Sequence, residues 1–235
     1  MSCKSTMLIT GSSRGIGRAV AEYFAHNGHA VIGCSRSASD LEHPNYKHFL
    51  LDLTDESAVR SFVRSLKKEY GKIDILVANV GLVDSSLLFS ATSGDLYQKF
   101  LSTNLTSAFY ICRETSKLMI GQQYGRIITM SSIMVTLHQP GTSIYSATKA
   151  ALTEMTKVMA REFAASGITC NVIAPCLVET ESSNALSNES RQLLLKQQTI
   201  QRPATIQELC HAITYLSAPE CSYLTGQVID ICMAR

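Results

Sequence analysis

Tyr145 and Lys149 lie four residues apart in the segment SIYSATKAAL, which has helical periodicity. Residues four apart on a helix share one face, so both side chains can contact one bound molecule. A phenol has a pKa near 10, and lowering it by three units takes roughly 4 kcal/mol of preference for the phenolate, which neighbouring positive charges could supply. Ser132 precedes this pair and could donate a hydrogen bond to the same substrate oxygen. These residues indicate acid–base chemistry; the alternative is an ordinary surface Tyr and Lys, since this spacing also occurs by chance.

A glycine-rich segment, TGSSRGIG, follows the first short apolar run and opens a helical pattern. It places Gly11, Gly15 and Gly17 at a strand-to-helix turn. Glycine permits positive φ and close approach of the backbone to a pyrophosphate, and a helix N-terminus offers free N–H groups. The segment therefore predicts a dinucleotide phosphate site, with an ordinary glycine-rich turn as the alternative.

The second apolar run ends in VIGCSR, at the place where an NAD-binding protein carries an acidic residue for the ribose 2′-hydroxyl. Here Ser35 and Arg36 stand instead. The guanidinium groups of Arg36 and Arg14 are suited to a 2′-phosphate, whereas a carboxylate would repel it. The sequence thus favours NADP(H), although Arg36 could also be a solvated surface residue.

Seven short apolar runs alternate with segments of helical periodicity. The runs fall at 7–10, 30–35, 48–53, 73–79, 125–132, 168–175 and 226–231, and the helical segments at 15–27, 56–70, 95–120, 143–166 and 205–216. This alternation predicts an α/β protein: a single-domain Rossmann fold over residues 1–235, with a doubly wound, seven-stranded parallel sheet and helices on both faces.

Local signals refine the expected elements. Thr54 is placed to begin the helix at 56–70, and any helix within 36–47 is expected to be short. The polar stretch around 180–201 reads as a flexible substrate flap, in which Leu193, Leu194 and Leu195 would form one face of a lid helix.

Composition narrows the class of protein. Hydrophobic residues make up 46% of the 235 residues, which argues against a disordered chain. Lys and Arg number 21 against 19 Asp and Glu, so no strong basic excess favours nucleic acid. The 8 cysteines include no CxxC pair and read as reduced thiols. No secretory segment or membrane span is evident, so we expect a cytoplasmic protein with no membrane partner.

Eight motifs occur in one order along the chain: TGSSRGIG, LDLTD, ANVG, TNL, MSSI, YSATK, NVIAP and YLTGQ. In these motifs the chain resembles the short-chain dehydrogenase/reductase family, in the compact form that includes 3-oxoacyl-[acyl-carrier-protein] reductases. The resemblance implies NADPH-dependent reduction of a ketone or 3-oxoacyl thioester to a secondary alcohol. Tyr145 would be the general acid, Ser132 would orient the carbonyl, Lys149 would bind the nicotinamide ribose and lower the Tyr145 pKa, and Asn104 would hold a water.

The resemblance also implies a set of cofactor contacts along the phosphate loop, the strand ends and the segment after NVIAP. Besides Tyr145 and Lys149, they are Gly11, Ser13, Arg14, Gly15, Ile16, Gly17, Ser35, Arg36, Asp52, Leu53, Asn79, Val80, Gly81, Pro175, Cys176, Val178 and Thr180. Two of these have structural alternatives, since Asn79 could tie neighbouring strand ends and Asp52 could cap the loop before Thr54.

The chain departs from the family pattern at several positions. Cys176 replaces the usual glycine after NVxAP, and Cys232 begins the segment that replaces the usual Asp-Gly-Gly after the last strand. Gln123 and Ser166 stand where fatty-acid enzymes carry basic residues for an acidic carrier protein. A carrier-protein role is weakened accordingly, and the homotetramer or homodimer that the resemblance implies is less certain. No metal site is expected.

Three functions stay open at this point. A carbonyl reductase leads; the same chemistry run in reverse would give an NAD(P)-dependent secondary alcohol or polyol dehydrogenase. A dinucleotide sensor or scaffold without turnover is the third, although the joint presence of Asn104, Ser132, Tyr145 and Lys149 argues against it. The candidate substrate-facing residues are Val83, Ile133, Met134, His138, Gln139 and Thr142.

Overall fold

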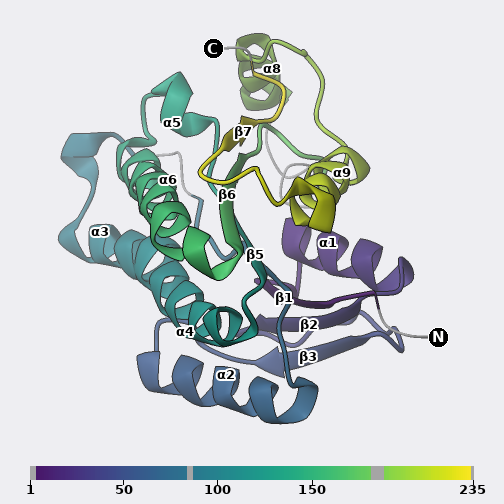
Figure 1. The fold of residues 1–235 in the computed structure, drawn as a ribbon. Helices are drawn as coiled ribbons and strands as arrows, with labels where there is room; N and C mark the ends of the chain where they lie inside the picture. The colour runs from purple at the N-terminus through teal and green to yellow at the C-terminus, as the bar shows by residue number, and fades with distance from the viewer. Residues whose placement is uncertain (1–3, 84–86, 181–187, 234–235) are drawn as a thin grey trace.

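A computed structural model describes residues 4–83, 87–180 and 188–233 of the chain (Figure 1). Its centre is one seven-stranded sheet in the order β3-β2-β1-β4-β5-β6-β7, in which every neighbouring pair is parallel. The strands are β1 Thr6–Thr10, β2 Ala30–Ser35, β3 Tyr46–Leu50, β4 Ile75–Ala78, β5 Gly125–Met130, β6 Ile168–Ala174 and β7 Val228–Asp230. The predicted Rossmann fold with a seven-stranded parallel sheet is confirmed.

Helices cover both faces of the sheet. They are α1 Gly15–His26, α2 Glu56–Tyr70, α3 Gly94–Phe100, α4 Ser107–Gln122, α5 Met134–Leu137, α6 Ser143–Phe163, α8 Asn188–Gln197 and α9 Ile206–Ser217, with short 3-10 turns at Phe89–Ala91, Ala164–Ser166 and Pro219–Cys221. One apolar core joins the sheet to α2, α4 and α6, and the other joins it to α1 and α9. β1, β2, β4, β5 and β6 are buried on both faces, as their unbroken apolar runs predict, whereas the edge strands β3 and β7 are partly exposed.

The order of the strands reverses between β1 and β4. From β1 the chain passes to β2 and then to β3 on one side of the sheet. It then crosses to the other side of β1, where β4 pairs with β1 and β5 pairs with β4. Ligands of doubly wound sheets bind at the carboxyl ends of the strands beside such a reversal. The segments that follow β1, β4 and β5 are therefore the ones to inspect for a site.

The third strand and its surroundings differ from the prediction. β3 starts at Tyr46 and ends at Leu50, so Asp52 and Leu53 lie beyond it, and the described residues 36–45 contain no helix. The next helix is capped by Asp55 and not by Thr54. The Asp55 carboxylate accepts hydrogen bonds from the backbone N–H groups of Ser57 and Ala58, which is the stronger cap because a carboxylate also meets the positive end of the helix dipole.

The long helix expected at 95–120 contains a π-helical segment, Leu101–Thr106, between α3 and α4. A π-segment inserts extra backbone into an otherwise regular helix and commonly marks a functional site. Here its buried residue is Asn104. Sequence periodicity cannot show this change, because helical φ and ψ continue across Phe100 and Ser107.

Among the helices of the described ranges, none combines the length and apolar character needed to cross a bilayer.

Candidate active site

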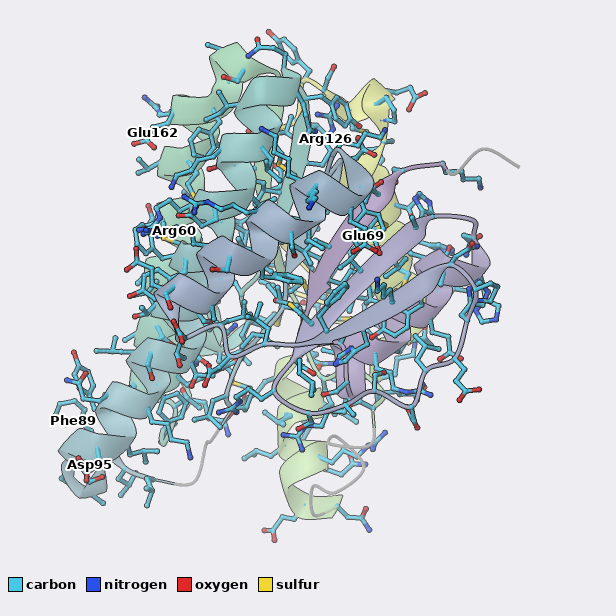
Figure 2. All side chains as sticks on the ribbon, turned by 90° about the horizontal axis from the view of Figure 1, so that it is seen from below. Arg60, Glu69, Phe89, Asp95, Arg126 and Glu162 are labelled. Carbon is cyan, nitrogen blue, oxygen red and sulfur yellow. The ribbon has the colours of Figure 1, made fainter. Side chains whose placement is uncertain are left out.

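The candidate catalytic residues come from segments at one end of the sheet. Ser132 follows β5, Tyr145 and Lys149 lie in α6, and Asn104 lies in the π-segment. Figure 2 shows Arg126, near the start of β5, far from Phe89 and Asp95, which mark the end of the molecule beyond the carboxyl edge of β4. The predicted site thus lies at the edge where strand reversal favours ligand binding.

Tyr145 is 7% exposed, and its hydroxyl lies close enough to that of Ser132 for the serine to lower its pKa. Ser132 Oγ also accepts a hydrogen bond of 3.2 Å from the Met134 backbone N–H, which fixes the serine at the start of the loop after β5. The two hydroxyl groups that the sequence analysis expects to act on one substrate oxygen therefore lie near each other. Such a pair can present two O–H groups to one substrate oxygen.

Lys149 is 3% exposed, and its Nζ donates a hydrogen bond of 2.7 Å to the Met130 carbonyl oxygen. The same Nζ lies 6.0 Å from the centre of the Tyr145 ring. Burial lowers the pKa of Lys149 to about 8. The ammonium is held beside the phenol by its carbonyl contact with the end of β5.

Burial raises the pKa of Tyr145, and the hydrogen bond with Ser132 opposes that rise by a smaller amount. This direction differs from the lowered pKa that the family resemblance implies. Burial removes water from the phenolate and so disfavours it. The Lys149 ammonium, which could offset this effect, is hydrogen-bonded to a backbone carbonyl instead.

Asn104 links three segments of the site. Its side-chain oxygen accepts a hydrogen bond of 2.6 Å from the Leu82 N–H, and its Nδ2 donates to the Leu82 carbonyl at 3.0 Å and to Thr148 Oγ1 at 3.1 Å. The Thr148 hydroxyl in turn donates to the Tyr145 carbonyl. The Asn104 side chain thus fixes the loop after β4 against α6, and the π-segment supplies the backbone shape that allows it.

The phosphate loop has the geometry that a dinucleotide needs. Gly11 and Gly15 have φ of 71° and 58°, and a Cβ on Gly17 would lie 2.2 Å from the Gly11 carbonyl oxygen. Arg14 is the N-cap residue of α1 but makes no side-chain cap, and the first turn contains no acidic residue. The N–H groups at the start of α1, near Ser13 and Ile16, can therefore meet phosphate oxygens.

Residues at the ends of β2 and β3 form the expected ribose side of the loop. Ser35 is buried, whereas Arg14 and Arg36 are exposed and able to reach a phosphate. Hydrogen bonds from Thr54 lower the pKa of Asp52, and the charge of Arg36 lowers it further by a smaller amount. Arg36 therefore lies near Asp52. The Asp52 carboxylate also caps the loop before Thr54, as the structural alternative holds.

The segment after β4 also contains a candidate cofactor residue, Asn79, that makes structural hydrogen bonds. Asn79 ties β4 to β1, because its N–H donates to Thr10 Oγ1 and its Nδ2 donates to the Thr10 carbonyl. Val80 N–H donates to the same hydroxyl. A Cβ on Gly81 would lie 3.1 Å from Lys149 Nζ, so the bare backbone at this position allows the lysine its place.

A short chain dehydrogenase family model matches residues 5–191. The chain belongs to the short-chain dehydrogenase/reductase family. It is 36% identical over 230 residues to the 3-oxoacyl-[acyl-carrier-protein] reductase FabG of Escherichia coli, covering 95% of this chain and 94% of that protein. The corresponding enzyme of Salmonella typhimurium is 37% identical, with the same coverage.

Solved structures agree with this membership. The structure of ElxO with NADP bound superposes with a TM-score of 0.91 at 29% sequence identity, covering 97% of each chain. A second ElxO structure, with NADPH bound, has a TM-score of 0.90 at 28% identity and covers 97% of this chain and 96% of the other.

Two departures from the family motifs meet in space. The Cys176 thiol, after Pro175, donates to the Leu177 carbonyl at 3.5 Å and lies close enough to the Cys232 thiol, which follows β7, to affect its titration. Burial first and this contact second raise the pKa of Cys176 to about 12. β6 and β7 are paired, so the residues that follow both strands lie side by side. The raised pKa keeps the Cys176 thiol in its protonated, weakly nucleophilic form.

The remaining cofactor residues of this family segment begin the expected flap. Val178 is buried and bridges to Ala204, and Thr180 is half-buried. Of the flap at 180–201, residues 181–187 lie outside the described residues, and a helix, α8, is present as predicted.

The three leucines of α8 do not share one face. Leu195 is 9% exposed, Leu194 is half-buried and Leu193 is 53% exposed. Consecutive residues point about 100° apart on a helix, so only one or two of them can pack on the domain.

Not all of the predicted substrate-facing residues reach the surface. Ile133 and Thr142 are each 2% exposed, whereas His138 and Val83 are exposed. A small pocket beside Tyr145 is lined by side chains that the sequence did not single out, including Leu87, Leu96, Phe100 and Ile144. Only the fold brings these chain segments together.

The sequence also did not single out His48 and Tyr46 on β3 or Ser12 in the phosphate loop. The structure places the His48 ring 3.1 Å from Ser35 Oγ. The alternation of 46 and 48 on one face of an extended strand was the available signal.

Proposed function

We propose that this protein is an NADPH-dependent oxidoreductase that reduces a ketone or 3-oxoacyl thioester to a secondary alcohol. The observation that carries the proposal is the buried Tyr145 hydroxyl beside Ser132, with Lys149 Nζ 6.0 Å from the centre of its ring. A phenol and a serine hydroxyl that converge on one point can bind a carbonyl oxygen from two directions.

Each residue has a defined task in this reaction. Ser132 donates a hydrogen bond to the substrate oxygen and stabilises the negative charge that develops on it. Tyr145 gives its O–H proton to that oxygen as general acid. Bound NADPH supplies the hydride that forms the new C–H bond.

Lys149 and Asn104 support the phenol. Lys149 is poised to hydrogen-bond the nicotinamide ribose, and its positive charge favours the phenolate that remains after proton transfer. Asn104 holds the loop after β4 and the start of α6 in register, and we assign it the water of the proton relay. Burial of Tyr145 and Lys149 keeps bulk water from the reacting atoms.

The choice of NADP(H) is supported by Ser35 and Arg36 at the end of β2 and by Arg14 on the phosphate loop. No carboxylate follows β2 directly to repel a 2′-phosphate. Structures of a relative, ElxO, contain NADP and NADPH, which is consistent with this assignment. The FabG relatives support a 3-oxoacyl thioester among the substrates to be tried.

We assign the protein to a homodimer or homotetramer. Exposed apolar side chains on α4 and α6, Phe109 at 42% and Val158 at 55% exposure, support an interface there. Light scattering of the purified protein measures its molar mass, and a monomer at micromolar concentration would refute the assignment.

The direct test measures the loss of NADPH absorbance with purified protein and a panel of ketones, β-keto esters, 3-oxoacyl thioesters and quinones. We expect turnover with at least one carbonyl and a higher kcat/KM for NADPH than for NADH. Parallel reactions with NADP⁺ and secondary alcohols or polyols measure the reverse direction. NADPH binding without turnover of any compound in either direction would favour the sensor or scaffold instead.

A further inference from the structure

One imidazole, that of His48, contacts the end of β2, the phosphate loop and a neighbouring residue of its own strand. Its Nε2 lies 3.1 Å from Ser35 Oγ and 3.0 Å from the Ser37 carbonyl oxygen. Its Nδ1 lies 2.8 Å from Tyr46 Oη and 3.4 Å from Ser12 Oγ. We call Ser12, Ser35, Ser37, Tyr46 and His48 the His48 network.

The direction of these hydrogen bonds follows from the carbonyl. A carbonyl oxygen can only accept, so the contact with Ser37 requires a proton on His48 Nε2. In the neutral ring Nδ1 then accepts from the Tyr46 hydroxyl. Ser35 Oγ also donates to the Ser37 carbonyl, at 2.7 Å.

These contacts bracket Arg36. The residue before it, Ser35, and the residue after it, Ser37, are both held by His48, so the backbone that carries Arg36 has little freedom. The other side of the ring reaches Ser12, two residues before Arg14 on the phosphate loop. The two segments that carry the arginines expected to meet a 2′-phosphate are therefore both in contact with one side chain on β3.

A glycine in β2, Gly33, leaves room for two members of the His48 network. A Cβ on Gly33, within β2, would lie 2.3 Å from both Ser12 Oγ and Tyr46 Oη. Any larger residue would displace the Tyr46 hydroxyl and, with it, the partner of His48 Nδ1. Gly33 has no positive φ, so the close approach explains the glycine here.

We propose that His48 is a positioning residue for cofactor specificity, which favours the 2′-phosphorylated dinucleotide by holding the Ser35–Ser37 turn that presents Arg36. The inference rests on the proposed use of NADP(H). It adds that discrimination between the two dinucleotides depends on a side chain of β3 that acts through the turn.

The test compares binding of NADP⁺ and NAD⁺ by calorimetry, which requires no turnover. His48→Phe keeps a planar ring but removes both hydrogen-bonding edges. We expect the Kd for NADP⁺ to rise about tenfold while the Kd for NAD⁺ changes by less than about twofold, because lost positioning affects only the 2′-phosphate. Ser35→Ala removes the same contact from the other side and, combined with His48→Phe, should add little further loss.

Matched controls separate positioning from general effects. Lys47→Gln removes a full positive charge from the neighbouring residue of β3, whose ammonium pairs with Glu69, and should leave both Kd values unchanged. His48→Gln restores a donor and should recover part of the preference for NADP⁺. If His48→Phe fails to fold, Tyr46→Phe, which removes the hydroxyl partner of His48 Nδ1 and no expected cofactor contact, is measured by the same ratio.

The outcomes distinguish two failures. Wild-type protein that binds NADP⁺ no more tightly than NAD⁺ would overturn the proposed cofactor, and this inference with it. Wild-type preference for NADP⁺ that persists unchanged in His48→Phe or, if that variant does not fold, in Tyr46→Phe would overturn the role of His48 alone, as would an equal weakening of both dinucleotides.

Discussion

Two ionisable side chains are buried next to each other in this protein, and burial shifts both toward their neutral forms. The pKa of Tyr145 is raised and that of Lys149 is lowered to about 8. A neutral phenol is the form that a reductase needs, because it must donate a proton. Lys149, by contrast, must be charged, because only its ammonium form can stabilise the phenolate that remains after proton transfer.

Tyr145→Phe removes the transferable proton while keeping the ring and its contact with Phe100. We expect kcat for any accepted ketone to fall by about 10²–10⁴-fold, with the Kd for NADPH nearly unchanged. Steady-state kinetics and a fluorescence titration of NADPH measure the two quantities. Tyr215→Phe, on the exposed face of α9, is the control and should retain wild-type kinetics. An unaltered kcat in Tyr145→Phe would rule out Tyr145 as the acid.

The pKa of Lys149 gives a pH dependence with a definite sign. Its pKa of about 8 lies below the ordinary value of 10.5, so the ammonium predominates below pH 8 and is lost as pH rises through that value. We expect kcat/KM for NADPH to fall by up to about tenfold per pH unit above pH 8, because this ratio reports groups of the free enzyme.

The pH profile has a matched control in the same helix. Lys157→Met removes an exposed α6 lysine that pairs with Glu154 and should keep the wild-type profile. Lys149→Met should lower kcat/KM at every pH and abolish the fall in kcat/KM above pH 8. A wild-type profile that stays flat between pH 7 and about pH 10 would contradict the role of Lys149.

At the scale of elements, strands and helices were predictable where one local pattern decides them. The unbroken apolar runs of β4 and β5 predicted strands buried on both faces, and Gly15 and Gly17 predicted the turn into α1. The cap of α2 was misplaced by one residue, because Thr54 and Asp55 are both good caps and the local backbone decides between them.

Contacts between elements were harder to predict. Ser12, Ser35 and His48 are far apart in sequence and meet only because β3, β2 and β1 are adjacent in the sheet. Cys176 and Cys232 were each recognised as departures from the motifs, yet their contact depends on the pairing of β6 with β7. Sequence therefore indicated which residues could do chemistry, and the register of the strands determined which of them meet.

The turn from β1 into α1 offers a test of element geometry. Gly17→Ala would place a Cβ 2.2 Å from the Gly11 carbonyl oxygen, which is backbone and cannot rotate away. We expect a loss of about 1–3 kcal/mol of unfolding free energy, measured by urea denaturation, together with weaker NADP⁺ binding. Gly121→Ala is the matched control, because its Cβ would meet nothing within 4 Å on α4 and should be neutral or stabilising by up to about 1 kcal/mol. Equal stability of the two variants would show that the phosphate loop is not packed as described.

At the scale of the whole molecule, the expected cofactor surface draws on segments from β1 to the loop after β6. A ligand that bridges these segments binds only the folded chain, so it must raise the free energy of unfolding. The phosphate loop, the Ser35–Ser37 turn and the Cys176 segment belong to different parts of the sequence. Thermal stability therefore reports whether one dinucleotide engages them together.

NADP⁺ at about 100 times its Kd should stabilise the protein by about 2.7 kcal/mol. For a chain of this size that corresponds to a rise in Tm of roughly 5–11 °C, measured by scanning calorimetry. NAD⁺ at the same concentration should give a clearly smaller rise. Arg36→Asp should reduce the NADP⁺ effect and leave the NAD⁺ effect in place or larger, since the carboxylate repels a 2′-phosphate but can accept a hydrogen bond from a ribose hydroxyl. Arg64→Asp makes the same charge change on the exposed face of α2 and should leave both shifts unaltered. If NADP⁺ produced no shift in the wild-type protein at any concentration, the assignment of the carboxyl edge of the sheet as a dinucleotide site would be wrong.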